Sequence, residues 1–193
     1  MKKALILLTA LSPVLLGCIP ASEGEAAAPP KIRSVYDGTP APRGDTMLRR
    51  TMMQTHNAAR RDVGAAALSW DNTLARSAQI YADKLARTGR FEHDPDNTGP
   101  AAQGENLWMG TRNAFGYAEM AGGWVDERKM FKPGIFPDNS TTGRWSDVGH
   151  YTQIIWPTNT HMGCALASSR SNDYLVCRYS PGGNIVGRDP LKG

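Results

Sequence analysis

The sequence contains few of the residues on which most catalytic and metal-binding motifs depend. Its 193 residues include only three Cys and four His. Neither the HExxH motif of zinc proteases nor the GxSxG turn of serine hydrolases is present, so neither of these enzyme classes is predicted. The formal net charge is only +4, and the Lys and Arg residues are dispersed. This distribution argues against a nucleic-acid partner. No internal repeat is visible.

Residues 1–17 have the features of a bacterial export signal. Lys2 and Lys3 precede an apolar stretch at residues 4–16, which is too short to span a bilayer comfortably. This stretch ends in LLGC at residues 15–18, which resembles a lipobox, so we expect cleavage before Cys18 and diacylation of its sulfur. Ile19 follows the cysteine where an Asp would indicate the inner membrane; by resemblance to Gram-negative lipoproteins, this points to the outer membrane. The alternative is an ordinary secretory signal with an incidental cysteine.

Residues 18–43 are rich in Ala, Pro, Gly and charged side chains and show no apolar periodicity. This composition is typical of a flexible tether. The remaining residues are numerous enough to form one domain with a proper hydrophobic core. We therefore expect a signal peptide at 1–17, a tether at 18–43 and a single domain at 44–193.

Cys164 and Cys177 remain as an even pair once Cys18 is assigned to a lipid. They lie in two apolar segments, 162–167 and 174–179, which are separated by a polar, turn-forming run. This pattern predicts a β-hairpin with the two cysteines on adjacent antiparallel strands, within reach of a disulfide bond. Two buried free thiols are the alternative, and the exported context favours the bridge.

Apolar residues at helical spacing predict helices over residues 45–63, 71–88 and 113–127, capped by Asp45 or Thr46, by Asp71 and by Asn113. Residues 90–112 contain several Pro and Gly, so they are expected to form a loop that includes the GENL segment described next. Residues 133–149 are expected to be irregular, and a short segment at 153–156 precedes the hairpin. Helices grouped around a small sheet indicate an α+β fold.

Four motifs occur in a defined order: HNAAR at 56–60, GENL at 104–107, GHYTQIIW at 149–156 and LVCRYSPGGN at 175–184. In this order they resemble the CAP superfamily, which comprises the cysteine-rich secretory, antigen 5 and pathogenesis-related-1 proteins. The resemblance covers residues 46–187. It implies a three-layer α-β-α sandwich with a small, mainly antiparallel central sheet.

In order and context, His93, Glu105, Glu127 and His150 match the two His and two Glu that line the central cavity of CAP domains. None of the four lies where an apolar stripe requires it, so we predict that they converge on one pocket. Such a set can bind a metal, catalyse acid–base chemistry on a bound water, or form a structural network. Two His ligands make an incomplete zinc site, so we expect no required cofactor and only weak zinc binding at His93 and His150.

A second group of polar residues is expected to form a structural network that ties the sheet, the helices and the loops together. Its members are His56, Asn57, Arg60, Asn106, Tyr151, Gln153 and Tyr179.

Two further patterns have competing interpretations. Ser146, Asp147 and His150 could form a catalytic triad, but three residues of one loop rarely converge on one point. The Trp residues at 108, 124, 145 and 156 either line an apolar groove for a lipid or belong to the core. Aromatic residues at these spacings more often belong to the core.

Three functions are compatible with the sequence, in decreasing order of preference. The first is a binding module, tethered to the outer membrane, for a lipid, a peptide or an envelope component. The CAP resemblance supports this function, because sterol and fatty-acid binding are linked to that family. The second is a hydrolase, such as a protease, that uses the two His and two Glu with a metal or an activated water. The third is a purely structural envelope protein.

Overall fold

A computed structural model describes residues 38–193. The predicted signal peptide and Cys18 lie outside these residues, as does most of the predicted tether. Within the described part of the chain, no helix has the length and apolar character needed to cross a membrane. The elements, in chain order, are α1 (Asp45–Asp62), β1 (Ser69–Trp70), α2 (Asn72–Thr88), β2 (Gly104–Thr111), α3 (Tyr117–Asp126), the 3₁₀ helices η1 (Glu127–Lys129) and η2 (Trp145–Asp147), α4 (Gly149–Ile155), β3 (His161–Ser168) and β4 (Asn172–Ser180).

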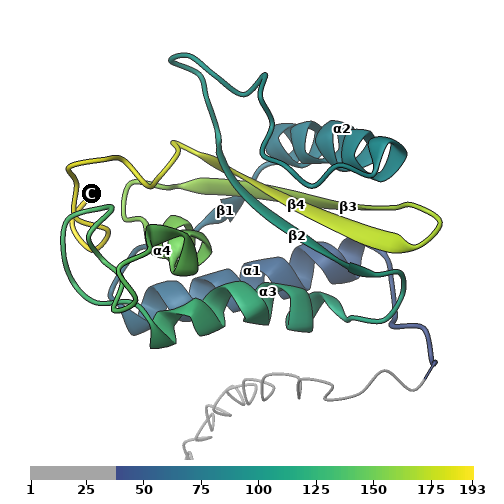
Figure 1. The fold of residues 1–193 in the computed structure, drawn as a ribbon, viewed down its shortest axis with the longest axis horizontal. Coiled ribbons are helices and arrows are strands. Elements are labelled where there is room, and N and C mark those ends of the chain that lie inside the picture. Colours follow the sequence, from purple (N-terminus) through teal and green to yellow (C-terminus); the bar gives the residue numbers. More distant parts are fainter. Residues whose placement is uncertain (1–37) are drawn as a thin grey trace, which may run out of the picture.

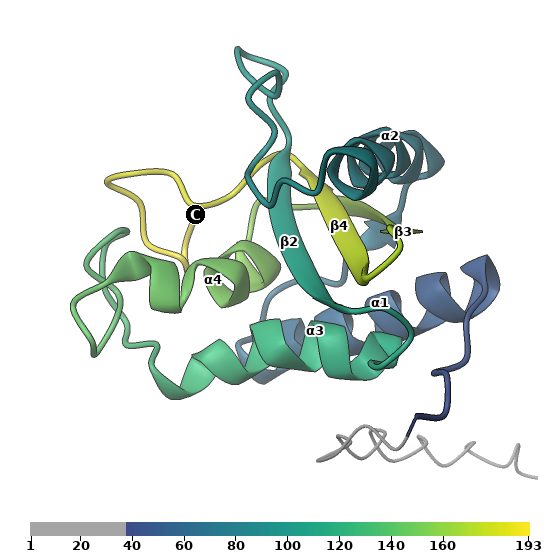
Figure 2. The ribbon, with the colours of Figure 1, turned by 45° about the vertical axis from the view of Figure 1, so that its right-hand side comes forward.

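The strands form one sheet in the order β1-β3-β4-β2. β2, β4 and β3 pair antiparallel, and the two residues of β1 pair parallel with the start of β3. Helix α2 covers one face of the sheet, while α1 and α3 lie side by side on the other face (Figures 1 and 2). The predicted α+β sandwich with a small, mainly antiparallel sheet is therefore confirmed.

Strand β4 shows why the sheet needs helices on both faces. Leu175, Cys177 and Tyr179 pack into the core shared with α1, α3 and α4. Tyr174 and Val176, which alternate with them, pack into the core shared with α2. Because both faces are covered, β4 is an almost continuous apolar run rather than an alternating one.

The predicted hairpin and its disulfide are present. Cys164 of β3 and Cys177 of β4 are directly opposed and bonded to one another, with their Cα atoms 4.1 Å apart. The cystine packs in the core on the α1 side of the sheet.

The helix boundaries differ in part from those expected. Asp71 caps α2 as predicted, because its carboxylate accepts hydrogen bonds from the N–H groups of Thr73 and Leu74. Helix α1 instead has Gly44 at its N-cap and no side-chain cap, with Asp45 as its first residue. Asn113 does not cap α3: it has φ 62° in a turn. The helix begins at Tyr117 after Gly116, whose N–H donates to the Glu119 carboxylate at 2.6 Å.

Two elements were not predicted: one lies in the expected loop at 90–112, and the other begins at the end of the irregular stretch 133–149 and runs into the segment 153–156. Gly104–Thr111 is strand β2, so Glu105 lies on the sheet rather than on a loop. Gly149–Ile155 is the short helix α4, with His150 in its first turn. Glycines are unfavourable in strands, so β2 was not recognised from its sequence. The packing at Gly104 is close: a Cβ there would lie 2.6 Å from the side-chain oxygen of Gln153, which would have to move.

Candidate functional site

His93 and Glu105 form the first imidazole–carboxylate pair. His93 lies on the loop after α2, and its Nδ1 is 2.6 Å from Oε1 of Glu105 on β2. The backbone N–H of Asp94 donates to the same oxygen at 3.1 Å. The His93 side chain is 66% exposed, whereas that of Glu105 is 5% exposed. A buried carboxylate thus orients an exposed imidazole through Nδ1 and leaves Nε2 for another partner.

Arg178 of β4 forms ion pairs with Glu105 and with Asp94, the residue after His93. Its side chain is 2% exposed, and Nη2 lies 2.7 Å from Asp94 Oδ2 and 3.0 Å from Glu105 Oε2. The guanidinium also lies over the ring of Tyr81 on α2, 5.2 Å from the ring centroid. A buried guanidinium requires such partners, because an unpaired charge in the core costs several kcal/mol, on the order of 3–5.

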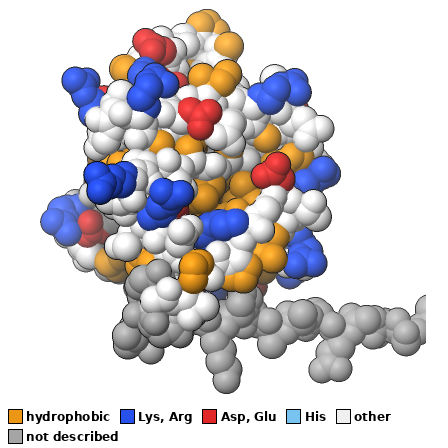
Figure 3. Space-filling model, turned by 90° about the vertical axis from the view of Figure 1, so that its right-hand side faces the viewer, with side chains coloured by type: hydrophobic (Ala, Val, Ile, Leu, Met, Phe, Trp, Pro, Cys, Tyr) orange, Lys and Arg blue, Asp and Glu red, His pale blue; other side chains and the backbone are white. Residues whose placement is uncertain are grey.

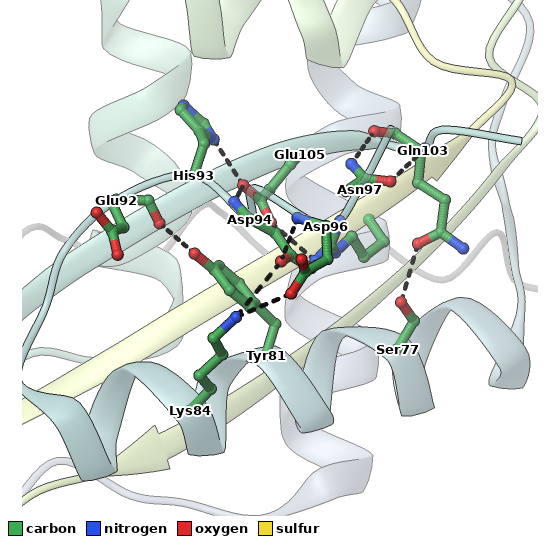
Figure 4. A network of polar contacts seen from close by, with 11 residues as sticks. Ser77, Tyr81, Lys84, Glu92, His93, Asp94, Asp96, Asn97, Gln103 and Glu105 are labelled. Carbon is green, nitrogen blue, oxygen red and sulfur yellow. Dashed lines mark hydrogen bonds and ion pairs between the residues drawn. The ribbon is translucent and has the colours of Figure 1, made fainter. Parts of the chain in front are cut away.

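The loop that carries His93 is tied to α2 by further polar contacts (Figure 4). Tyr81 donates its hydroxyl to the Glu92 carbonyl at 2.6 Å, and Lys84 lies 3.2 Å from Asp96. Burial, followed by the nearby charge of Glu105, raises the pKa of Tyr81, so its hydroxyl remains protonated. Asn97 and the Gln103 backbone close the loop with hydrogen bonds of 2.7 and 2.8 Å.

His150 and Glu127 form the second pair. Nδ1 of His150 is 2.6 Å from Oε1 of Glu127, and Oε2 accepts the backbone N–H groups of His150 at 2.9 Å and Tyr151 at 3.0 Å. The His150 ring stacks on Trp124, with 5.8 Å between ring centroids. The His150 side chain is 31% exposed. As in the first pair, one carboxylate oxygen forms a hydrogen bond with Nδ1 of the imidazole. The other carboxylate oxygen accepts hydrogen bonds from backbone N–H groups.

The two pairs are connected through Asn106. This residue follows Glu105 on β2, and its side-chain amide donates to the His150 carbonyl at 3.1 Å. Each imidazole contacts its own carboxylate. Across residues 38–193, no three His, Cys, Asp or Glu side chains are grouped closely enough to hold a metal by themselves. Convergence of His93 and His150 on one shared metal or water stays a prediction.

Beneath this surface, His56 is fully buried on α1 and uses both ring nitrogens. Nδ1 lies 2.8 Å from the Met52 carbonyl, which can only accept, so Nδ1 carries the proton. Nε2 therefore accepts the hydroxyl proton of Tyr179 at 2.8 Å. Burial lowers the pKa of His56 to about 4, and burial also raises the pKa of Tyr179. Both groups are thus neutral at physiological pH and serve packing rather than proton transfer.

Arg60, also buried, donates only to backbone carbonyls. Its acceptors are Ala66 at 2.6 Å, Ile154 and Trp156 at 2.8 Å each, and Asn159 at 3.0 Å. Arg60 thereby joins α1 to the end of α4 and to the loop before β3.

The remaining members of the expected network join neighbouring segments. Asn57 exchanges hydrogen bonds with the backbone of Leu68, at 2.8 and 3.2 Å. Gln153 accepts the N–H of Gly183 at 3.2 Å. Burial raises the pKa of Tyr151, whose ring packs against Phe131.

The structure argues against a serine triad. Nδ1 of His150 is occupied by Glu127, while Asp147 accepts hydrogen bonds from Thr142 at 2.7 Å and Arg144 at 3.0 Å. Asp147 therefore does not orient the imidazole, as a triad carboxylate must.

The four Trp side chains do not form one exposed row. Trp124 and Trp156 are core residues at 3% and 0% exposure, and Trp145 is half exposed. Trp108 is partly buried and packs against Phe115.

Arg178 and Asp94 were not anticipated from the sequence. Arg178 lies between Cys177 and Tyr179, after the apolar run 174–177 of β4. A charged residue in such a strand needs a buried carboxylate, and this requirement was the available signal.

Comparisons with known proteins identify the family and the fold. The sequence profile described as the cysteine-rich secretory protein family, CAP, matches residues 53–179. Pathogenesis-related protein 1B of Nicotiana tabacum is 34% identical over 139 residues, which cover 72% of this chain and 77% of the tobacco protein. Cysteine-rich venom protein VAR3 of Varanus acanthurus is 36% identical over 152 residues, covering 73% of this chain and 81% of the lizard protein.

A solved structure is similar at the level of the fold. The crystal structure of NaASP2 with Zn²⁺ has a TM-score of 0.63 and 22% sequence identity, covering 78% of this chain and 88% of that chain. The profile match spans more than half of the sequence, and the relatives exceed 30% identity over most of it. This chain belongs to the CAP family of cysteine-rich secretory proteins.

Proposed function

We propose that the protein is an exported, membrane-tethered CAP-domain module that binds a lipid, a peptide or an envelope component. In this proposal His93 and His150 also bind a divalent cation weakly. The observation that carries it is the shared arrangement of the two pairs. Each imidazole is oriented through Nδ1 by a carboxylate that is itself held by backbone N–H groups. This is how imidazoles are presented to a metal or a ligand through Nε2.

The same contacts favour binding over hydrolysis. A general base needs a carboxylate oxygen within reach of the substrate proton. Both oxygens of Glu127 already accept hydrogen bonds, and Glu105 is 5% exposed beside Arg178. Both carboxylates therefore suit the positioning of an imidazole better than the transfer of a proton.

Zinc is the cation that best suits two imidazoles. Nε2 of His93 and Nε2 of His150 would hold it, and water or a ligand group would have to complete its coordination. Zinc supplies Lewis acidity and a fixed attachment point for an anionic ligand group. NaASP2, a protein of similar fold, was crystallised with Zn²⁺, which supports the choice of ion.

The test is a side-by-side measurement of zinc binding by calorimetry and of hydrolysis of labelled casein. We expect the His93→Ala/His150→Ala variant to bind zinc at least tenfold more weakly than the wild type. His161→Ala is the matched control, because His161 is exposed and outside both pairs. Casein turnover that is present in the wild type and lost in the double variant would replace the binding proposal with a hydrolase.

Export and tethering rest on the N-terminal sequence and on the secretory character of the family. Cys18 lies outside the described residues. If the tether is correct, mass spectrometry of the protein from its native membrane will find a mature chain that begins at an acylated Cys18. A mature chain with an unmodified N-terminus at another position would refute it.

A further inference from the structure

Among the described residues, the outer edge of β3 has no strand partner after Met162. β1 pairs only with His161 and Met162, and β4 occupies the other side of the strand. Cys164 and Cys177 face each other with Cα atoms 4.1 Å apart, the spacing of a non-hydrogen-bonded antiparallel pair. The N–H and C=O of Cys164 therefore point away from β4. Those of Leu166 do the same, because directions alternate along a strand with a period of two.

Met162 confirms this direction, since its carbonyl accepts the N–H of Asp71 at 2.8 Å on the same side of β3. After β1, the chain turns away from this edge of the sheet and enters α2. The first turn of α2 crosses Gly163 so closely that a Cβ there would lie 2.6 Å from the Asp71 carbonyl oxygen. Beyond Gly163, no strand within residues 38–193 pairs with this edge. The outer edge of β3 is thus paired with β1 at its first two residues and has no strand partner after them in the part of the chain that the structure describes.

A groove of about 680 Å³ follows the open edge. Residues 44–49 at the start of α1 form one wall, and residues 72–79 of α2 form the other. Cys164, Ala165, Leu166 and Ser168 form the floor. Figure 3 views this side of the molecule: hydrophobic side chains lie in a hollow, with Lys and Arg side chains and some acidic ones around it. The groove thus combines an apolar floor, unpaired backbone groups and two helical walls.

The charge of the groove is positive. Its lining includes three arginines, Arg43, Arg49 and Arg76, and one acidic residue, Asp45. Arg43 is paired with Asp173 at 2.7 Å. Arg49 and Arg76 are exposed on opposite walls, and neither forms an ion pair with a carboxylate of the described chain. Arg49 lies over the ring of Trp70, 5.7 Å from its centroid. Two guanidinium groups without a carboxylate partner favour an anionic occupant and fit carboxylates well.

We propose that this groove binds an extended, acidic polypeptide segment of a partner protein, which adds to the sheet as a strand beside β3. Backbone hydrogen bonds to Cys164 and Leu166 would hold it, and Arg49 and Arg76 would contact its Asp or Glu side chains. At about 3.3 Å per residue, the edge from Cys164 to Ser168 accommodates roughly five residues.

A peptide fits this groove better than a lipid chain does. An acyl chain would bury the outward N–H and C=O groups of Cys164 and Leu166 without hydrogen bonds, which costs about 1–3 kcal/mol for each group. A peptide strand satisfies the same groups. The proposal rests on the binding role proposed above, but it uses a surface separated from β2 by two strands of the sheet. Zinc binding by His93 and His150 is therefore tested independently of it.

The experiment uses the full chain and an acetylated eight-residue peptide with the repeat Val-Val-Glu-Glu, which places Glu on both faces of an added strand, and a C-terminal fluorophore. We expect fluorescence anisotropy to show saturable binding that weakens at least tenfold in Arg49→Glu/Arg76→Glu. The matched control is Arg61→Glu/Arg87→Glu, which reverses two exposed arginines on the same helices outside the groove. The control should bind as the wild type does, and a peptide with Lys in place of Glu should not bind.

Amide hydrogen exchange by NMR then locates the peptide. Binding should slow exchange at Cys164 and Leu166, whose N–H groups point outward. It should leave Ala165 and Ala167 unchanged, because their N–H groups already face β4. Absence of saturable binding, equal weakening in both double variants, or unchanged exchange at Cys164 and Leu166 would overturn the proposal.

Two other occupants give distinct results that also overturn it. Protection of Cys164 and Leu166 without peptide, together with a concentration-dependent dimer in sedimentation, would assign the groove to a second copy of the chain. The same protection in a monomer, lost when residues 1–37 are removed, would assign it to the chain's own N-terminal segment.

Discussion

Tyr179 donates its hydroxyl proton to Nε2 of His56 across 2.8 Å, and this bond joins β4 to α1 inside the core. His56 gives its own proton to the Met52 carbonyl, so the imidazole is satisfied only in its neutral form. A protonated His56 would place two N–H donors and a positive charge where one acceptor is needed.

This arrangement predicts a loss of stability in mild acid. The pKa of His56 is about 4 in the folded protein, below its ordinary value of 6.5. Between these values the unfolded chain binds a proton that the folded chain does not, so stability rises with pH across this window. Full stability is present above pH 6.5, and His56 alone should account for a loss of about 3 kcal/mol by pH 4.

Urea unfolding between pH 4.5 and 7.5, for the wild type and His56→Gln, measures this contribution. The variant should be less stable at pH 7, but its stability should fall less steeply as the pH decreases. Parallel curves for the two proteins would show that His56 does not carry the effect.

Arg60→Lys should destabilise the protein although the charge is kept. A single ammonium group cannot reproduce the planar fork that reaches four carbonyls, so buried acceptors are left without donors. We expect a loss of about 2–4 kcal/mol in urea unfolding. Arg61→Lys, next to it but exposed, should change stability by less than about 0.5 kcal/mol. Equal effects of the two substitutions would contradict this account of Arg60.

Removal of the disulfide should weaken the fold without abolishing it. The bond closes a short loop, with a sequence separation of 13, and should contribute about 3 kcal/mol in the chain-entropy model. Cys164→Ala/Cys177→Ala should therefore melt at a lower temperature and keep its far-UV circular dichroism, because two separate core clusters remain. A random-coil spectrum at 25 °C would show that the fold depends on this bond.

Glu127→Gln should weaken zinc binding about 10–100-fold, because an amide orients the imidazole less well and adds no charge. Calorimetry at pH 7.5 gives the affinity, and circular dichroism checks that the overall fold is intact. Glu92→Gln is the control, since the Glu92 side chain is 54% exposed and belongs to neither pair. An unchanged affinity in Glu127→Gln would remove His150 from the proposed zinc site.

The parts of the fold that could be predicted from the sequence are those with a clear period. Helix α2 has an apolar stripe with a cap at Asp71 and Gly89 in the left-handed region at its end. The hairpin has two apolar segments around a polar turn. Helix α4 has no visible period, because six of its seven residues are buried, so no polar face marks it. β1 has only two residues and owes its existence to pairing with β3.

The site was predictable only in its most recognisable members. His93, Glu105, Glu127 and His150 could be named from their motifs, whereas their pairing depends on which segments the fold brings together. Asp94 and Arg178 escaped notice because their roles arise from a contact between residues 84 positions apart. No local sequence pattern indicates a contact between residues so far apart in the chain.

Helix α4 has only seven residues, fewer than an isolated helix needs to persist in water. Its first turn is held by the Glu127 carboxylate, while Arg60 supplies donors to the Ile154 carbonyl in its last turn and to Trp156 just beyond it. Two residues outside the helix thus replace the terminal hydrogen bonds that a longer helix obtains from caps or water. The orientation of the His150 imidazole therefore depends on the contacts at both ends of α4. Sequence drift at Arg60, on the neighbouring helix α1, would reorient a side chain at the surface that it never contacts.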